Sequence, residues 1–197
     1  MKFLFDLGGV FFDWNPRYFY SSIFSSEDKM EYFLTEICND EMNLKADSGI
    51  LIKDLKNELI IKFPTFEKEI IMYYDNHRKM IKKLFQESIE ILLDLKNNNY
   101  QCYVLSNWSA ETFIGMENEY PFLKKFDGKI ISGQDKLIKP NQEIYELAIS
   151  RFNLIPQETV FIDDKIENIE AAKKMNFKFI HLINPSIIKR EIYKFIV

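Results

Sequence analysis

Short apolar runs alternate with helix-like segments through the second half of the chain, and this alternation constrains the fold most. The apolar runs lie at residues 100–106, 129–132, 159–163 and 177–183. The helix-like segments between them are Ala110–Glu119, Asn141–Phe152 and Ile166–Met175. Strands separated by helices at this spacing form a parallel sheet that is covered on both faces. The pattern predicts an α/β fold, with Pro140 in the first turn of the second helix.

The first hundred residues follow a different pattern. Residues 2–6 form one more apolar run, which brings the expected number of strands in the sheet to five. Residues 15–85 carry apolar side chains at helical spacing, without the alternation of a strand. We therefore expect a core domain made of residues 1–14 and 86–197. We expect residues 15–85 to be a helical insertion that covers the strand ends as a lid.

Composition and charge exclude several classes of protein. With 197 residues, of which 47% are hydrophobic, the chain can bury one full core and a smaller second one. Its formal net charge is −4, and its charged residues are scattered along the chain without a basic stripe. We therefore expect no nucleic-acid partner and no membrane partner. Asp6 interrupts the N-terminal apolar run and no stretch of about 18 apolar residues follows, which argues against a signal peptide or a spanning helix. The two isolated cysteines favour buried thiols in a reducing compartment, and we expect a cytoplasmic protein.

Polar residues follow the predicted strands at the points where the strands end. In an open parallel sheet, ligands bind outside the carboxyl ends of the strands. Ionised carboxylates are rarely buried without partners, so an acidic residue at the end of an apolar strand indicates a functional site. The residues at these ends are Asp6, Gly8 and Gly9, then Ser106 and Asn107, then Ser132 and Gly133, then Asp163 and Asp164, with Lys139 just before a predicted helix. The sequence therefore predicts one polar site at one edge of the sheet.

The order of these motifs resembles that of the haloacid dehalogenase-like hydrolase superfamily. The matching stretches are FDLGGV at 5–10, VLSN at 104–107, the lysine of IKP at 138–140, and FIDD at 161–164 followed by Asn168. The resemblance covers the whole chain. It implies a Rossmann-like core with a parallel five-stranded sheet, helices on both faces, and a helical cap inserted after the first strand.

The resemblance also implies roles for the residues of the predicted site. Asp6 is the expected nucleophile, with Ser106 and Lys139 stabilising the phosphoryl group. Several carboxylates and a phosphate repel one another strongly unless a cation is present. We therefore expect Mg²⁺, held by Asp6, Asp164 and the carbonyl group of Gly8. Asp163 and Asn168 are expected to orient the ligands or to hold a bound water.

The expected substrate is a small phosphorylated or halogenated molecule, bound by a monomer or a homodimer. The residues that we expect to contact it are Gly9, Trp14, Asn43, Asp47, Asn107 and Trp108. His77 and His181 lie outside the motifs, and we expect both to be packed or exposed rather than catalytic.

One residue departs from the pattern of the phosphatases in this superfamily. They usually carry a second aspartate two residues after the nucleophile, which protonates the leaving oxygen and later activates water. Gly8 occupies that position here. The loss of a general acid typically lowers a rate by ~10²–10⁴-fold. Asp13 and Asn15 are the nearest polar candidates to replace it.

The absent general acid leaves two further interpretations open. A metal-independent 2-haloacid dehalogenase displaces halide and needs no proton, and it uses an arginine to bind the substrate carboxylate, for which Arg17 and Arg78 are available. The acidic pair Asp163–Asp164 favours the metal-dependent phosphatase instead. The other interpretation is a binding protein on the same fold with weakened catalysis.

Overall fold

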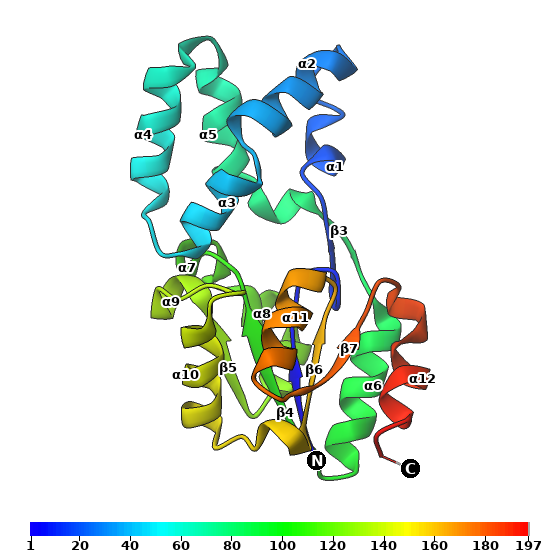
Figure 1. Cartoon of the computed structure of the whole chain (residues 1–197). Coiled ribbons are helices and arrows are strands. Elements are labelled where there is room, and N and C mark those ends of the chain that lie inside the picture. The colour runs from blue at the N-terminus through cyan, green and yellow to red at the C-terminus, as the bar shows by residue number, and fades with distance from the viewer. Residues whose placement is uncertain (197) are drawn as a thin grey trace.

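Five parallel strands form the central sheet of the computed structural model, which describes residues 1–196. Their order across the sheet is β5-β4-β1-β6-β7, so β1 lies in the middle (Figure 1). All four neighbouring pairs are parallel. The strands are β1 (Lys2–Phe5), β4 (Gln101–Ser106), β5 (Gly128–Ile131), β6 (Thr159–Asp163) and β7 (Lys178–His181). The prediction of an α/β fold with a five-stranded parallel sheet is confirmed.

Helices cover both faces of this sheet, and each face has its own apolar core. On one face lie α6 (Gln86–Asn97) and α12 (Ile188–Tyr193), and on the other lie α10 (Gln142–Phe152) and α11 (Ile166–Lys174) (Figure 1). Successive side chains of a strand point to opposite faces. Phe3 and Phe5 therefore pack with α6 and α12, whereas Leu4 packs with α10 and α11. In residues 1–196 no helix is both long and apolar enough to cross a membrane.

A separate helical body lies beyond the carboxyl ends of the strands (Figure 1). Its own core includes the buried rings of Tyr20, Phe33 and Tyr73. Its helices are α1 (Arg17–Tyr20), α2 (Glu27–Tyr32), which continues into a π-helical turn at Phe33–Ile37, α3 (Asp40–Asp47), α4 (Ile52–Lys62) and α5 (Glu67–Asp75). It also contains short 3₁₀ turns at Pro64–Phe66 and His77–Met80. The other 3₁₀ turns belong to the core, at Pro121–Lys125, Pro156–Glu158 and Pro185–Ile187.

A two-stranded antiparallel sheet joins the helical body to the core. Strand β2 (Phe12–Trp14) leads into the helices and β3 (Ile81–Leu84) leads out, with Phe12 opposite Leu84. The prediction that residues 15–85 contain no strand is therefore wrong at their carboxyl end. The four residues of β3 are too few to show an alternating pattern, and pairing with β2 determines their conformation.

Two other local predictions are also wrong. The single helix expected at Ala110–Glu119 is interrupted, because Gly115 adopts a left-handed φ of 82° between α7 (Ala110–Phe113) and α8 (Met116–Glu119). Pro140 lies before the helix rather than in its first turn, since α10 begins after the N-cap residue Asn141. A short helix, α9 (Ser132–Asp135), follows β5 directly.

Candidate active site

The carboxylate of Asp6 lies at the carboxyl end of β1, the central strand. Its backbone N–H donates to the carbonyl of Ile162 at 2.9 Å, which continues the pairing with β6 by one residue. Its Oδ1 accepts hydrogen bonds from the Ser106 hydroxyl at 2.6 Å and from the Leu7 N–H at 2.7 Å. Two donors from different strand ends therefore fix the orientation of this buried carboxylate.

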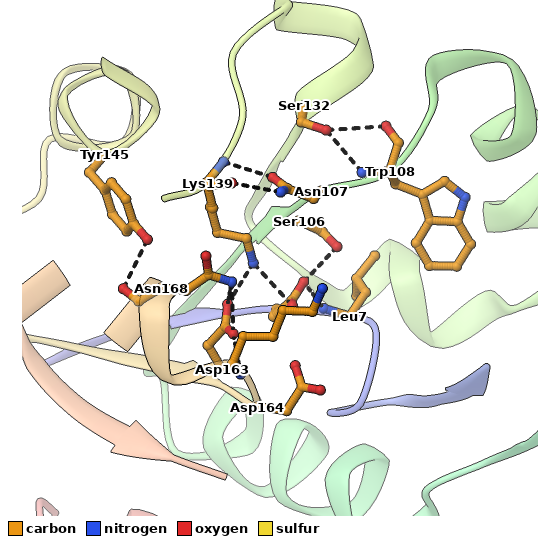
Figure 2. Close-up of polar contacts among 12 residues, drawn as sticks. Leu7, Ser106, Asn107, Trp108, Ser132, Lys139, Tyr145, Asp163, Asp164 and Asn168 are labelled. Atoms are coloured by element: carbon orange, nitrogen blue, oxygen red, sulfur yellow. Dashed lines mark hydrogen bonds and ion pairs between the residues drawn. The ribbon is translucent and has the colours of Figure 1, made fainter. Parts of the chain in front are cut away.

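Lys139 connects two of the acidic residues. Its side chain is fully buried, and its Nζ lies 3.0 Å from Asp6 Oδ2 and 2.6 Å from Asp163 Oδ2 (Figure 2). Asp163 also accepts from the Asn168 amide at 3.0 Å and from the Lys165 N–H at 2.8 Å. Because both oxygens of Asp163 are engaged in this way, Asp163 holds Lys139 beside Asp6.

Asn107 positions the backbone of Lys139. Its Oδ1 accepts from the Lys139 N–H at 2.8 Å, and its Nδ2 donates to the Lys139 carbonyl at 2.9 Å (Figure 2). These two bonds join the loop after β4 to the segment before α10. Asn107, which we expected to contact a substrate, therefore already uses both polar groups of its side chain within the protein.

Asp164 lies against the loop that follows β1. A Cβ atom added to Gly9 would be 2.2 Å from Asp164 Oδ2, and the φ of Gly9 is +66°. Both observations require glycine at position 9. The absence of a side chain at Gly9 thus allows Asp164 to approach the Asp6 loop closely.

Three carboxylates gather at this edge of the sheet. Oxygen atoms of Asp6, Asp163 and Asp164 all lie within 4.8 Å of one another. Burial raises the pKa of Asp6 to about 7; Lys139 opposes this shift, and Asp163 and Asp164 add to it. Burial and the charge of Asp163 also raise the pKa of Asp164. Lys139 alone therefore does not neutralise the cluster, and its carboxylate oxygens suit a hard cation such as Mg²⁺.

A cavity of about 360 Å³ separates this cluster from the helical body. Most of the site residues expected from the sequence line it, and Ser106 and Asp163 are buried in the strand ends beneath it. The expected residues that line the cavity are Asp6, Gly8, Gly9, Trp14, Asn43, Asp47, Asn107, Trp108, Lys139, Asp164 and Asn168. The fold thus brings together residues that are separated by more than 150 positions in the sequence.

The end of α3 is fixed over the core by Ser132. The hydroxyl of Ser132 donates to the carbonyl of Asp47 at 2.6 Å and accepts from the N–H of Trp108 at 2.9 Å. Burial raises the pKa of Asp47 to about 7, with Lys165 opposing the shift and Asp6 adding to it. Asp47 is therefore a cavity carboxyl group that carries a proton over part of the neutral range.

Asp13 does not lie beside Asp6. Asp13 lies in β2, accepts a hydrogen bond from the Tyr18 hydroxyl at 2.8 Å, and is absent from the cavity lining. Gly8 does line the cavity, and no atom lies within 4 Å of a Cβ atom built on it. The position of the usual second aspartate is therefore open space.

Two cavity residues have no signal in the sequence. We expect His77 to be packed or exposed, and it is packed: its ring stacks on Trp14 with centroids 5.3 Å apart and lies 5.7 Å from the ring of Trp108. Tyr74 lines the same cavity from α5. Neither residue belongs to a motif, and both reach the cavity only through the packing of the helical body. His181 is outside the cavity, where its Nε2 lies 3.0 Å from the carbonyl oxygen of Asp164.

Curated phosphatases resemble this chain over most of its length. Sesquiterpene phosphatase astK of Aspergillus oryzae is 27% identical over 179 residues, which cover 91% of this chain and 88% of that protein. The phosphorylated carbohydrates phosphatase of Thermotoga maritima is 23% identical, with 93% and 85% of the two chains covered.

Solved structures show the same fold. A magnesium complex of a HAD family enzyme from Bacteroides thetaiotaomicron has a TM-score of 0.72 at 21% identity, covering 91% of each chain. L-2-haloacid dehalogenase from Xanthobacter autotrophicus has a TM-score of 0.65 at 15% identity, covering 98% of this chain and 82% of that one. The model of the haloacid dehalogenase-like hydrolase family matches residues 3–182. Together with the strand-end cluster, this match shows that the chain is a hydrolase and belongs to the haloacid dehalogenase-like family.

Proposed function

We propose that this hydrolase cleaves small phosphate monoesters in a Mg²⁺-dependent reaction. The observation that carries the proposal is the cluster of Asp6, Asp163 and Asp164, whose oxygens lie within 4.8 Å of one another beside one shared lysine. A phosphate dianion would enter this negative site only with a cation. The similarity to curated phosphatases over about nine-tenths of the chain supports the same reaction.

The residues present fit a magnesium ion. Asp163 is buried beneath the cavity, whereas Asp6, Gly8 and Asp164 line it, so Asp6, Asp164 and the carbonyl of Gly8 are the proposed ligands. A few carboxylate oxygens with water and phosphate oxygens is the ligand set that Mg²⁺ favours. When bound, the ion supplies positive charge that offsets the repulsion between Asp6 and the phosphoryl oxygens.

In the proposed reaction, Asp6 is the nucleophile. One of its carboxylate oxygens attacks phosphorus, the bond to the leaving oxygen breaks, and an aspartyl-phosphate forms. The hydroxyl of Ser106 and the ammonium group of Lys139, which bind Asp6 in the free protein, stabilise the negative charge of the phosphoryl oxygens. Water then attacks the aspartyl-phosphate and releases phosphate.

We propose Asp47 as the proton donor that replaces the usual second aspartate. Its carboxyl group lines the cavity, burial raises its pKa to about 7, and α3 is held over the strand ends by Ser132. A general acid is most effective when its pKa lies near the working pH. Asp47 gives its proton to the leaving alcohol and takes a proton from the attacking water, so the cycle leaves it unchanged.

The two alternative functions have less support. A 2-haloacid dehalogenase would need an arginine for the substrate carboxylate. Arg17 pairs with Glu31 and Arg78 pairs with Glu119, and no arginine is among the described residues that line the cavity. A binding protein without activity would not need the buried pairing of Lys139 with Asp6. Burying these charges costs desolvation free energy that their attraction often does not recover.

The test is a substrate panel with and without metal. Purified protein should hydrolyse p-nitrophenyl phosphate with Mg²⁺, and EDTA should abolish the activity. Halide release from 2-chloropropionate that persists in EDTA would contradict the proposal and favour the dehalogenase. Absence of turnover on both substrates, with the protein folded and Mg²⁺ bound, would favour the binding protein.

A further inference from the structure

The three carboxylates of the cluster are not held in the same way. Lys139 pairs with both Asp6 and Asp163, and the amide of Asn168 also donates to Asp163. The carboxylate of Asp164 bonds to its own backbone N–H, and no other side chain in residues 1–196 forms a hydrogen bond or an ion pair with it. The direction of the Asp164 carboxylate therefore depends on the main chain of Asp164.

The main chain of the acidic pair is fixed by β7, which lies beside β6 with His181 opposite Asp163 (Figure 1). The N–H of Leu182 donates to the carbonyl of Asp163 at 2.9 Å. The Nε2 atom of His181 lies 3.0 Å from the carbonyl oxygen of Asp164. Because a carbonyl oxygen only accepts hydrogen bonds, Nε2 carries a hydrogen and donates it. Strand β7 thus supplies one donor to each carbonyl of the pair.

The bond from His181 replaces a backbone bond that is absent at this point. Strand β6 ends at Asp163, so Asp164 lies beyond the regular pairing of the sheet. In the part of the chain that the structure describes, no backbone N–H donates to the carbonyl of Asp164. Backbone carbonyl groups away from water need a hydrogen-bond partner. The imidazole of His181 is the side chain that provides it.

The direction of the Asp164 carboxylate matters because this group lies in a confined place. Its Oδ2 would be 2.2 Å from a Cβ atom added to Gly9, and it shares the cluster with Asp6. A rotation of the main chain at Asp164 would turn the carboxylate away from the oxygens of Asp6. Mg²⁺ requires nearly ideal octahedral geometry, so one misdirected ligand weakens binding. Groups that only orient metal ligands typically change metal affinity or activity by ~10- to 100-fold when they are removed.

We propose that His181 is a positioning residue for the proposed metal site. Its hydrogen bond to the carbonyl of Asp164 directs the carboxylate of Asp164 toward Asp6. This inference rests on the Mg²⁺ site of the proposed function. His181 itself lies outside the cavity and does not contact the substrate or the metal.

Two variants of His181 that differ in one donor test the proposal. His181→Gln keeps an N–H donor at about the distance of Nε2 along the side chain, whereas His181→Leu removes it. Calorimetric titration with Mg²⁺ alone measures binding without turnover. His181→Leu should raise the Kd for Mg²⁺ by ~3- to 10-fold, the effect of one neutral hydrogen bond, and His181→Gln should stay close to wild type. An unchanged Kd in His181→Leu, or an equal rise in both variants, would overturn the proposal.

Phe179→Leu separates positioning of Asp164 from general support of the strand. Phe179 lies two residues before His181 in β7, so both side chains are on the same face of the sheet. The substitution alters β7 and leaves the donor to the carbonyl of Asp164 in place. It should leave the Kd for Mg²⁺ unchanged. A rise equal to that in His181→Leu would show that any disturbance of β7 has this effect, and would contradict the proposal.

A double-mutant cycle identifies the residue through which His181 acts. In the Asp164→Asn background, His181→Leu should raise the Kd for Mg²⁺ no further, because the carboxylate that it positions is absent. A second rise of the same size would show that the two residues act independently, and would overturn the proposal.

The same titrations distinguish this proposal from the proposed reaction. If wild-type protein binds Mg²⁺ but does not hydrolyse p-nitrophenyl phosphate, the result counts against the phosphatase reaction and not against the role of His181. Wild-type protein that binds no Mg²⁺ overturns both.

Discussion

The edge of the sheet at which we propose that catalysis takes place, called the catalytic edge, and the aromatic residues that line the same cavity differ in how their polar groups are paired. At the catalytic edge, Asp6 binds Ser106 and Lys139, and Asp163 binds Lys139 and Asn168. The buried polar atoms of the aromatic residues Trp14, Tyr74, His77 and Trp108 have no hydrogen-bond partner among the described residues. The groups that we propose to act on phosphate are thus already oriented by hydrogen bonds and ion pairs in the free protein, whereas the aromatic residues are held by ring packing.

This difference suggests separate roles for the two regions, with the reaction at phosphorus at the catalytic edge and contact with the rest of the substrate elsewhere in the cavity. Preorganised donors and charges stabilise a transition state without further rearrangement, and they serve any phosphate ester equally. Side chains that line the rest of the cavity would contact the alcohol part of a bound ester instead, and this part differs from one ester to the next. We therefore expect substitutions at the two regions to affect different kinetic quantities.

The largest expected effect is that of Asp6→Asn at the catalytic edge. It should lower kcat on every phosphate ester by at least ~10³-fold, because the nucleophile is lost. The fold should survive. The side chain keeps its shape, Lys139 keeps Asp163 as a partner, and a carboxylate whose pKa burial raises to about 7 is replaced by a neutral amide. Steady-state kinetics and thermal unfolding of the same preparation measure both quantities.

Near-native activity in the Asp6→Asn protein would contradict covalent catalysis by this residue. Asp164→Asn, beside the same loop, should also lose activity, but added Mg²⁺ at high concentration should restore part of it. Asp164→Asn is therefore the control, because Mg²⁺ partly restores activity after the loss of a metal ligand and does not do so after the loss of a nucleophile.

The catalytic edge was largely predictable from the sequence, and the aromatic lining of the cavity was not. Asp6, Ser106 and Asp163 each end a buried strand, and parallel strands bring such positions to one edge whatever the loops between them do. Trp14 and Trp108 were expected to contact substrate only because they lie near motifs. Tyr74 and His77 carry no local pattern, since their place depends on how the helical body packs onto the core.

Asp13, a candidate for the missing proton donor, lies outside the cavity for the same reason: tertiary packing, and not the local sequence, determines which residues reach the cavity. Asp13 is close to Asp6 in sequence, but β2 pairs with β3 and carries its carboxylate out of the cavity. Asp47 is distant in sequence, but its backbone binds Ser132 and it enters the cavity. Distance along the chain therefore did not predict which carboxyl group lines the cavity with Gly8.

The second prediction concerns this proton donor. Asp47→Asn should lower kcat for hexyl phosphate by ~10²-fold or more, and for p-nitrophenyl phosphate by less than ~10-fold, because nitrophenolate leaves without a proton. In the wild-type protein, kcat for hexyl phosphate should fall as the pH rises above about 7, where the pKa of Asp47 lies and its carboxyl group loses its proton. The variant should lack this decline. An unchanged pH profile in Asp47→Asn would exclude Asp47 as the acid.

The same pKa predicts the effect of Asp47 on stability. A carboxyl whose pKa is higher in the folded state than in the unfolded state favours folding below the unfolded pKa, and this contribution is lost as the pH rises through the folded pKa. For Asp47 the window runs from 3.8 to about 7. Asp47→Asn should therefore raise the unfolding temperature relative to wild type at pH 8 more than at pH 4.

The smallest expected effect comes from Gly8→Asp, which moves the proton donor from the helical body to the core. The position tolerates a side chain, because no atom lies within 4 Å of its Cβ and its φ is outside the left-handed region. Gly9 next to it tolerates none.

In the Asp47→Asn background, Gly8→Asp should restore turnover of hexyl phosphate by ~10-fold, up to ~10²-fold if the new carboxyl reaches the bridging oxygen. The nitrophenyl ester should gain little. Gly8→Asn has a similar size and no charge, so it is the control and should restore nothing. A fourth carboxylate also adds repulsion at the cluster, which makes Mg²⁺ dependence steeper and gives a second readout of where the new side chain lies. Equal gains from Gly8→Asp and Gly8→Asn would show that the side chain acts by filling space and not by donating a proton.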